Sequence, residues 1–536
     1  MLFEERTGKI LEFERVLAEL HPVTPFGQKY RNEMTPFLPG QEEELLEELR
    51  RVDRVRELVE NQRSVFVELR TAMRQLKDIR RSVERSMEGL SLTPVEFFEL
   101  KNMAALFRTI VACIDQIHWK VPEDLRSKPM QWLEELLDPE KSGLKTFYVY
   151  DCYSEVLACV RNEKGKVEKT LELERKKIIK EIEEETGLSV RANGEITVSR
   201  SNGESLQLLK NHPLLVLSNE TYINSTFKVK PNDTMLECTE QIECLKGDEA
   251  VEESAVLEEL SKKTGERGAE ILWNMDAIGR LDLLIAKAYH ANTNKSVLPW
   301  LSPSGSIRIT NGRHLLVEAG LRKKGKDYTS VSVSLNEGVA LITGANMGGK
   351  TVSLKMIGLL QGMFQYGLLI PADDMETRLL RFIYVSAGDE QNIDQGLSTF
   401  GAEIKSINEA LKKSVQGGLI LVDELARGTN PHEGYAISAA IIEFLKKKPS
   451  FTVITTHFDG LVTEGVKHLQ VKGLRNLDYT KLDNTSQISD FMDYNLIEIQ
   501  GEVGIPRDAL NISKIMGMPD EIISHAEWIL ARGEVE

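Results

Sequence analysis

Hydrophobic residues in the first 130 positions recur at intervals of three and four among charged ones. The pattern is clearest between residues 41 and 87, where Leu and Val stand among Glu and Arg. Such spacing is typical of amphipathic helices that bury one face. The segment SLTP at residues 91–94 indicates a further helix start, because proline is accommodated in the first helical turn. We therefore predict a mostly helical N-terminal region.

The pattern changes between residues 145 and 260. Short β-like runs occur at Tyr148–Tyr150 and Ile196–Val198, and a long charged helix is predicted between them at residues 166–187. Residues 214–237 alternate weakly and include turn residues. We predict that this region is an insertion in the helical scaffold.

A helical pattern returns at residues 252–291. After Pro299, short β-branched strands alternate with Gly-rich turns and amphipathic helices, which is typical of α/β folds. The predicted fold is therefore multidomain, with a mostly α-helical N-terminal core followed by an α/β domain. The sequence predicts four segments, at residues 1–145, 146–260, 261–300 and 301–536.

The composition fits a helix-rich protein with a buried core, since 41% of the 536 residues are hydrophobic and 28% are charged. No apolar stretch approaches the roughly 18 to 20 residues that cross a bilayer, and the charged N-terminus is unlike a secretory signal. We expect a cytoplasmic protein without a membrane partner. The net charge of −16 argues against DNA as a default partner, although a local basic patch could still bind it. Five cysteines without a CxxC pair are expected to be reduced, buried thiols: Cys113, Cys152, Cys159, Cys238 and Cys244.

The sequence GANMGGKT at residues 344–351 matches the phosphate-binding pattern G-x-x-x-x-G-K-[ST]. An apolar run precedes it at Val339–Ile342 and an amphipathic helix follows it, which is the context of a P-loop. Lys350 would reach the β- and γ-phosphates of ATP, and the Thr351 hydroxyl would bind Mg²⁺. The predicted nucleotide-binding residues are Gly344, Ala345, Asn346, Met347, Gly348, Gly349, Lys350, Thr351 and Val352.

Two further strands are predicted to end at the same site. The apolar run at residues 418–422 ends in Asp423 and Glu424. Asp423 would hold Mg²⁺ with Thr351, and Glu424 would orient or deprotonate the attacking water. The strand at residues 451–456 ends at His457, which would hydrogen-bond a terminal phosphate. We therefore predict Glu424 and His457 as catalytic residues, with a purely structural role as the alternative for the histidine.

These motifs resemble those of the MutS family of DNA mismatch-repair ATPases. TGANMGGKT is similar to the family's P-loop phrase, with Ala345 in place of a proline, and TTHF to its histidine switch. DEQNIDQGLSTF resembles its signature loop, and DELARGTNPHEG its segment from Walker B to the D-loop. These motifs are most similar to those of the second bacterial branch of the family. The resemblance is specific in about the last 230 residues. We expect the protein to lack the mismatch-reading domain and the C-terminal nuclease domain.

The resemblance implies an ABC-type ATPase domain at residues 301–536, a helical core or lever at residues 1–145 and a clamp-like insertion at residues 146–260. It also implies a homodimer with composite ATP sites. Ser398 and Thr399 would then lie against the γ-phosphate held by the second copy. Helix capping is the alternative role for Ser398.

Two hypotheses follow for the partner that the ATPase acts on. In the first, the insertion closes on DNA as a clamp, with phosphate contacts from Lys166, Lys169, Arg175, Lys176 and Lys177. Glutamates interleave with these residues, so a solvated helix is the alternative. In the second, the ATPase remodels a protein client, such as a cobalamin-dependent aminomutase, which would suit the acidic net charge.

Overall fold

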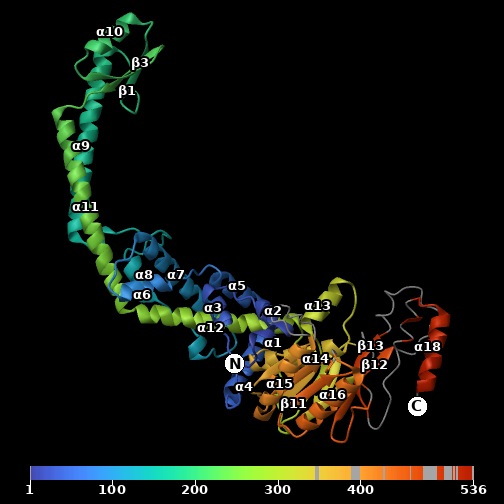
Figure 1. Cartoon of the computed structure of the whole chain (residues 1–536). Coiled ribbons are helices and arrows are strands. Elements are labelled where there is room, and N and C mark those ends of the chain that lie inside the picture. Colours follow the sequence, from blue (N-terminus) through green and yellow to red (C-terminus); the bar gives the residue numbers. More distant parts are fainter. Residues whose placement is uncertain are drawn as a thin grey trace. The chain divides into compact units, whose positions relative to one another are not determined.

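The computed structural model describes residues 2–344, 349–387, 399–426, 429–458, 460–474, 492–499, 510, 513–514 and 517–533 (Figure 1). The chain forms two compact units. Unit 1 comprises Met1–Leu76, Ala112–Arg126 and Asp276–Glu536, and unit 2 comprises Lys77–Val111 and Ser127–Met275. Among the described helices, none combines the length and the apolar character that crossing a membrane requires.

The N-terminal part of unit 1 is helical, as the spacing of its hydrophobic residues predicts. Helix α4 (Glu42–Asn61) buries one face, formed by Leu45, Leu49, Val52, Val55, Leu58 and Val59. Helix α3 begins after Thr24, whose hydroxyl accepts a hydrogen bond from the Gly27 N–H, and has proline at its first position. The other helical elements here are α1 (Glu5–Ile10), α2 (Phe13–Ala18), α3 (Pro25–Asn32), α5 (Arg63–Met73) and η1 (Glu123–Leu125).

A six-stranded sheet lies at the centre of unit 1. Its strand order is β13-β12-β7-β11-β10-β9, and all neighbours are parallel except β12 and β13. The parallel strands therefore end at one common edge of the sheet. The strands are β7 (Gly338–Thr343), β9 (Ile383–Ala387), β10 (Leu419–Asp423), β11 (Phe451–Thr455), β12 (Lys467–Leu474) and β13 (Met492–Glu498).

Helices cover both faces of this sheet, because its central strands are continuous apolar runs. Ile420 and Val422 of β10 pack in one cluster with residues of helices α15 (Thr399–Lys413) and α16 (Pro431–Leu445). Leu421 faces the other side, where it lies against Gly358 of helix α14 (Lys350–Gln365). Successive residues of β10 therefore contact helices on opposite faces of the sheet.

The N-terminal residues cover one edge of this sheet. The Leu2 carbonyl accepts a hydrogen bond of 2.7 Å from the N–H of Ile383 on β9, the edge strand. The Thr7 hydroxyl accepts another from the Val385 N–H. Phe3 and Phe13 pack around the ring of Tyr366, just after α14. Residues separated by most of the chain therefore share one core.

Within the described residues, unit 1 also contains a second sheet and four more helical elements. The sheet has the strand order β4-β8-β5-β6, and its β5 and β8 are antiparallel. The strands are β4 (Trp300–Leu301), β5 (Ile307–Gly312), β6 (Val331–Leu335) and β8 (Asp374–Thr377). The remaining helices are α12 (Gly268–Thr293, which begins in unit 2), α13 (Leu315–Lys323), η4 (Ser414–Gln416) and α18 (Asp520–Gly533).

Unit 2 begins with a group of short and medium helices. Helix α7 starts at Pro94, as the sequence predicts. The Thr93 N–H and hydroxyl donate to the Glu96 carboxylate, and the Glu96 N–H donates back to the Thr93 hydroxyl. This reciprocal pattern is a capping box. The elements here are α6 (Arg80–Met87), α7 (Pro94–Gln116), α8 (Gln131–Leu137) and η2 (Asp151–Tyr153).

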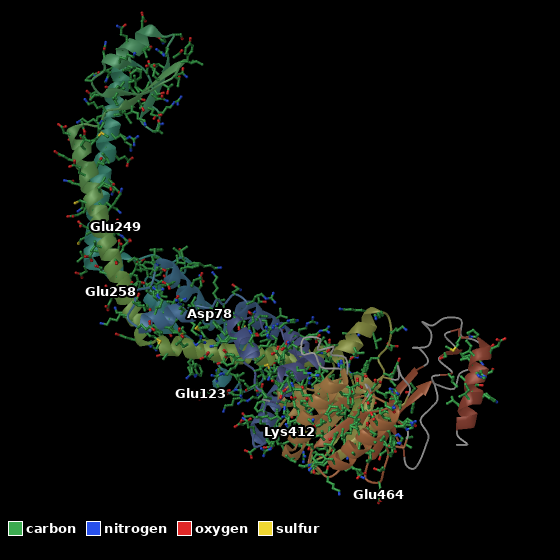
Figure 2. The ribbon with its side chains drawn as sticks, viewed as in Figure 1. Asp78, Glu123, Glu249, Glu258, Lys412 and Glu464 are labelled. Atoms are coloured by element: carbon green, nitrogen blue, oxygen red, sulfur yellow. The ribbon has the colours of Figure 1, made fainter. Side chains whose placement is uncertain are left out.

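Two long antiparallel helices extend through unit 2, α9 (Glu155–Thr186) and α11 (Asp233–Glu266). They lie side by side (Figure 1). Arg161 of α9 binds Glu249 and Glu253 of α11, at 2.9 and 2.5 Å, and Lys164 also pairs with Glu249 (Figure 2). Near its end, α11 packs closely on α6, because a Cβ at Gly265 would lie 2.2 Å from the Ser86 carbonyl oxygen.

The far end of this helix pair carries a small α/β tip, formed by residues 187–231 (Figure 1). Its antiparallel sheet has the order β1-β3-β2, and its core joins Ile196, Val198 and Phe227 to Ile178 and Ile182 of α9. Tyr222, between β2 and β3, is 97% exposed. The elements are β1 (Glu195–Ser199), α10 (Gly203–Asn211), β2 (Leu215–Glu220) and β3 (Asn224–Val229).

Three expectations about local structure are wrong. Tyr148–Tyr150 is not a strand; Tyr150 is buried, and its hydroxyl donates to Asp138 at 2.9 Å. The helix predicted at residues 252–291 is two helices that break at Arg267. All five cysteines are free, but only Cys113 and Cys238 are buried; the others lie on solvated helix surfaces of unit 2.

Candidate active site

The predicted site residues lie where β7, β10 and β11 end. These strands are neighbours in the parallel part of the sheet, so the residues that follow them come together. Gly344 and Lys350 follow β7, Asp423 and Glu424 end β10, and His457 follows β11. The order of the motifs along the chain predicted that these residues lie together. They do so because β7, β11 and β10 are adjacent parallel strands that end at the same edge of the sheet.

Lys350 is the buried cation of the site. Lys350 is only 5% exposed, and its Nζ donates a hydrogen bond to the Gly344 carbonyl at 2.6 Å. Burial lowers the pKa of Lys350 to about 8, although Glu424 and Asp423 act in the opposite direction. The two carboxylates therefore offset only part of the cost of burying the ammonium, and this favours the binding of an added anion.

Gly349 begins the helix that carries Lys350. Its backbone is left-handed, with φ 81° and ψ 13°, and a Cβ there would lie 2.9 Å from Cδ1 of Tyr494 on β13. Both observations require glycine at this position. The N-terminus of α14 therefore begins at a glycine beside the sheet, and N–H groups at a helix N-terminus favour a phosphate.

Thr351 and Asp423 form a pair of oxygen ligands. The Thr351 hydroxyl donates to the Asp423 carboxylate, with oxygen distances of 2.9 and 3.1 Å. A hydroxyl and a carboxylate beside a phosphate-binding helix are the ligands that Mg²⁺ takes in nucleotide sites. The side chains predicted to hold Mg²⁺ are therefore adjacent.

His457 contacts both Glu424 and Lys350. Nε2 of His457 lies 2.7 Å from Oε1 of Glu424, and Nζ of Lys350 lies 3.2 and 3.3 Å from the two ring nitrogens. Glu424 has φ 55°, an uncommon conformation for a residue with a side chain. Such strain at the mouth of a sheet is typical of functional residues.

Thr455 joins the two acidic residues. Its hydroxyl donates to Oδ1 of Asp423 at 2.7 Å and accepts from the N–H of Glu424 at 2.8 Å. Thr455 is not among the residues predicted from the sequence, where the histidine two positions later is the more distinctive feature. The signal was present, because a threonine at the end of a buried strand places a hydroxyl beside the neighbouring strand's carboxylate.

Several predicted residues lie outside the described part of the chain: Ala345, Asn346, Met347, Gly348 and Ser398. Thr399 begins α15, but its side chain is also outside that part. Val352 lies in the first turn of α14. The described residues thus bring together the lysine, the two threonines, the two acids and the histidine.

The lysines predicted to contact DNA lie on α9, together with glutamates of the same helix. Lys176 pairs with Glu172 at 2.7 Å and Lys177 with Glu174 at 3.8 Å. The Arg175 guanidinium reaches the Ala192 carbonyl at 3.5 Å, while Lys166 and Lys169 lie in the N-terminal half of the same helix. The interleaved glutamates therefore offset much of this charge.

A family model for MutS domain V matches residues 340–533. The chain is similar to proteins named endonuclease MutS2. That of Lachnospira eligens is 31% identical over 474 residues, which are 84% of this chain and 55% of the relative. That of Shouchella clausii is 28% identical over 98% of this chain and 64% of the relative. That of Ruminiclostridium cellulolyticum is 28% identical over 99% of this chain and 65% of the relative. The chain thus spans little more than half the length of the relatives it matches.

Proposed function

Because the chain belongs to the MutS family, we propose that unit 1 hydrolyses ATP to ADP and phosphate. The observation that carries this proposal is the network at the sheet edge. Lys350 at the start of α14, the two acids at the end of β10, and His457 after β11 lie together there. His457 is within 3.3 Å of both Lys350 and Glu424, and Thr351 donates to Asp423 at 2.9 Å.

Each described side chain has one role in this proposal. Lys350 binds phosphate oxygens, since its buried ammonium sits at the N-terminus of α14. Glu424 orients the attacking water and takes up its proton, and the hydrogen bond from His457 holds that carboxylate in place. His457 also lies beside Lys350, so it is placed to respond when the terminal phosphate leaves.

The same residues fit a magnesium ion. Thr351 and Asp423 would hold it, because their oxygens are already adjacent. When bound, Mg²⁺ supplies positive charge that offsets the negative charge on the β- and γ-phosphates. Release of the Thr351 hydroxyl from Asp423 would free both ligands for the ion.

Substitution of Glu424 tests the ATPase proposal. E424Q keeps the shape of the side chain but cannot accept a proton, so we expect ATP hydrolysis to fall at least about 100-fold while binding of a fluorescent ATP analogue is retained. K350A should lose binding of the analogue. E464Q, at an exposed glutamate before β12 (Figure 2), is the matched control and should behave as wild type. A wild-type chain that does not hydrolyse ATP contradicts the proposal.

We further propose a homodimer with composite sites, in which Ser398 and Thr399 lie against the nucleotide held by a second copy. The family resemblance supports this arrangement, and so does the start of α15 at Thr399, because a helix N-terminus favours phosphate. Mixing K350A with S398A tests it. After random exchange about half of the dimers are mixed, and each mixed dimer has one intact site of its two. The mixture should therefore reach about a quarter of wild-type activity. Absence of any recovery contradicts composite sites.

For the partner, we propose DNA, bound by the tip of unit 2 rather than by its long helices. Helix α9 has eight basic and nine acidic residues, and α11 has three basic and eleven acidic. Residues 187–231 instead have five basic and three acidic residues, and the exposed Tyr222 lies at the end of a hairpin. Unlike the two long helices, the tip thus has a positive balance, which phosphate contacts require.

The alternative is a protein client, and the acidic surface of α11 favours it. That helix offers a long anionic face to a basic protein surface, whereas it repels DNA. A client of this kind includes the aminomutase considered above. The ATPase chemistry would be the same in both cases.

Fluorescence anisotropy with homoduplex and branched DNA, with and without ATP and at two salt concentrations, separates the two partners. We expect salt-sensitive binding that is weakened by K210E together with K230E, at exposed tip lysines. The matched variant K176E with K177E, in α9, should have a smaller effect. Binding no tighter than roughly 10⁻⁴ to 10⁻⁶ M, the range of non-specific contacts, favours the protein client.

A further inference from the structure

Thr455 is the last residue of β11 and is fully buried, with 0% exposure. A threonine hydroxyl has one hydrogen to donate and lone pairs to accept. Here the hydrogen goes to Oδ1 of Asp423, and a lone pair accepts the Glu424 N–H. One hydroxyl therefore fixes the side chain of one acid and the main chain of the next.

The contact to Glu424 falls at a strained point of the backbone. Glu424 has φ 55°, and such a conformation persists where the surroundings hold it. Its N–H donates to the Thr455 hydroxyl in a part-buried position, and loss of such an acceptor is costly. The Thr455 hydroxyl thus stabilises the conformation that directs the Glu424 carboxylate to His457.

The contact to Asp423 complements that of Thr351. Asp423 accepts from both threonine hydroxyls. If Thr351 turns to a metal ion, as in the proposed function, the hydrogen bond from Thr455 remains to fix the carboxylate. The orientation of Asp423 then depends on Thr455 in the state that carries out hydrolysis.

We propose that Thr455 is a positioning residue that aligns Asp423 and Glu424 for ATP hydrolysis, an inference that rests on the proposed ATPase function. Because Thr455 acts through two residues of the hydrolysis step, its loss affects turnover more than ATP binding. Its hydroxyl carries the effect, so serine can replace it and valine cannot.

Thr452 provides a matched control on the same strand. It is also buried, at 2% exposure, but its hydroxyl has no hydrogen-bond partner within the described part of the chain. Valine has nearly the shape of threonine. T452V therefore makes the same chemical change in β11 without touching the acidic pair.

The test compares steady-state ATP hydrolysis and thermal stability of the whole chain. We expect T455V to lower kcat about 10- to 100-fold, the range set by losing one or two buried hydrogen bonds, with KM for ATP changed less than about threefold. T455S should stay within about threefold of wild type, and T452V should match wild type. T455A is the second variant if T455V does not fold, with the same loss of kcat expected.

Three outcomes overturn the inference. T455V with wild-type kcat shows that the hydroxyl is dispensable. T455S as impaired as T455V shows that the hydroxyl is not what matters. An equal loss in T452V traces the effect to the strand rather than to the acids. Failure of the wild-type chain to hydrolyse ATP is distinct from these, because it contradicts the proposed function and removes this inference with it.

Discussion

The substitution G349A probes the entrance to helix α14. Gly349 has φ 81° and ψ 13°, and an alanine in this left-handed conformation costs about 1–2 kcal/mol. The new Cβ would also lie 2.9 Å from Cδ1 of Tyr494, and such overpacking adds about 1 kcal/mol or more. The two costs together come to about 2–3 kcal/mol.

This strain falls on the segment that would surround the phosphates, so we expect it to weaken nucleotide binding. At about 1.4 kcal/mol per factor of ten, the Kd of a fluorescent ATP analogue should rise roughly 30- to 150-fold. The assay is a titration of the analogue, followed by anisotropy, together with a thermal melt.

Two companion variants separate the causes. In G349A with Y494A the ring contact is removed, so only the backbone cost remains and the Kd should rise roughly 5- to 30-fold over Y494A alone. G320A is the control, since Gly320 lies in α13 with nothing within 4 Å of its added Cβ; it should stabilise the protein by about 0.5–1 kcal/mol. Nucleotide affinity within twofold of wild type in G349A would refute the reasoning.

Three further expectations concern charge and stability. The charged form of Lys350 predominates below its pKa of about 8, so ATP affinity should fall as pH rises, by about tenfold from the low-pH limit to pH 9. Titrations of a fluorescent ATP analogue at several pH values measure this fall, and K350R should remove the pH dependence. D282A should lower the free energy of unfolding in urea by about 2–4 kcal/mol, because Asp282 is buried and accepts three hydrogen bonds from Val23 and Thr24; unchanged urea midpoints would contradict this. R161A should lower the protection of α9 and α11 amides in hydrogen exchange, since Arg161 joins α9 to Glu249 and Glu253 of α11 and also binds Asp151 and the Val149 carbonyl just before α9.

The location of the candidate site residues was predictable because short segments of sequence encode it. The glycine-rich segment before Lys350 is recognisable from a few residues of sequence. So are the two acids at the end of an apolar run. The parallel strands then bring these short segments to one edge. Confirmed in this way are the strand before the P-loop, the helix after it, and the strands that end at Asp423 and before His457.

The remaining features depend on contacts between distant residues. The packing of Leu2 and Thr7 on β9 joins segments about 380 residues apart. The hydrophobic periodicity of the sequence does not indicate such a contact. Tyr148–Tyr150 has the composition of a strand, but the bond from Tyr150 to Asp138 and the burial of that ring decide its structure. The break at Arg267 likewise follows from close packing of Gly265 on Ser86.

The contact between Thr7 and Val385 also sets an order of events during synthesis. At about 5–20 residues per second, the ribosome needs roughly 20 to 75 s to make the 378 residues between them. Unit 2 is complete within that interval, while Leu2 and Thr7 still lack strand β9, which they contact in the folded chain. Nascent chains arrested before residue 383 should therefore resist protease in unit 2 and be cut near the N-terminus. Assembly of the six-stranded sheet is in this sense a late event, which would delay the proposed ATPase activity until β9, β10 and β11 have been made.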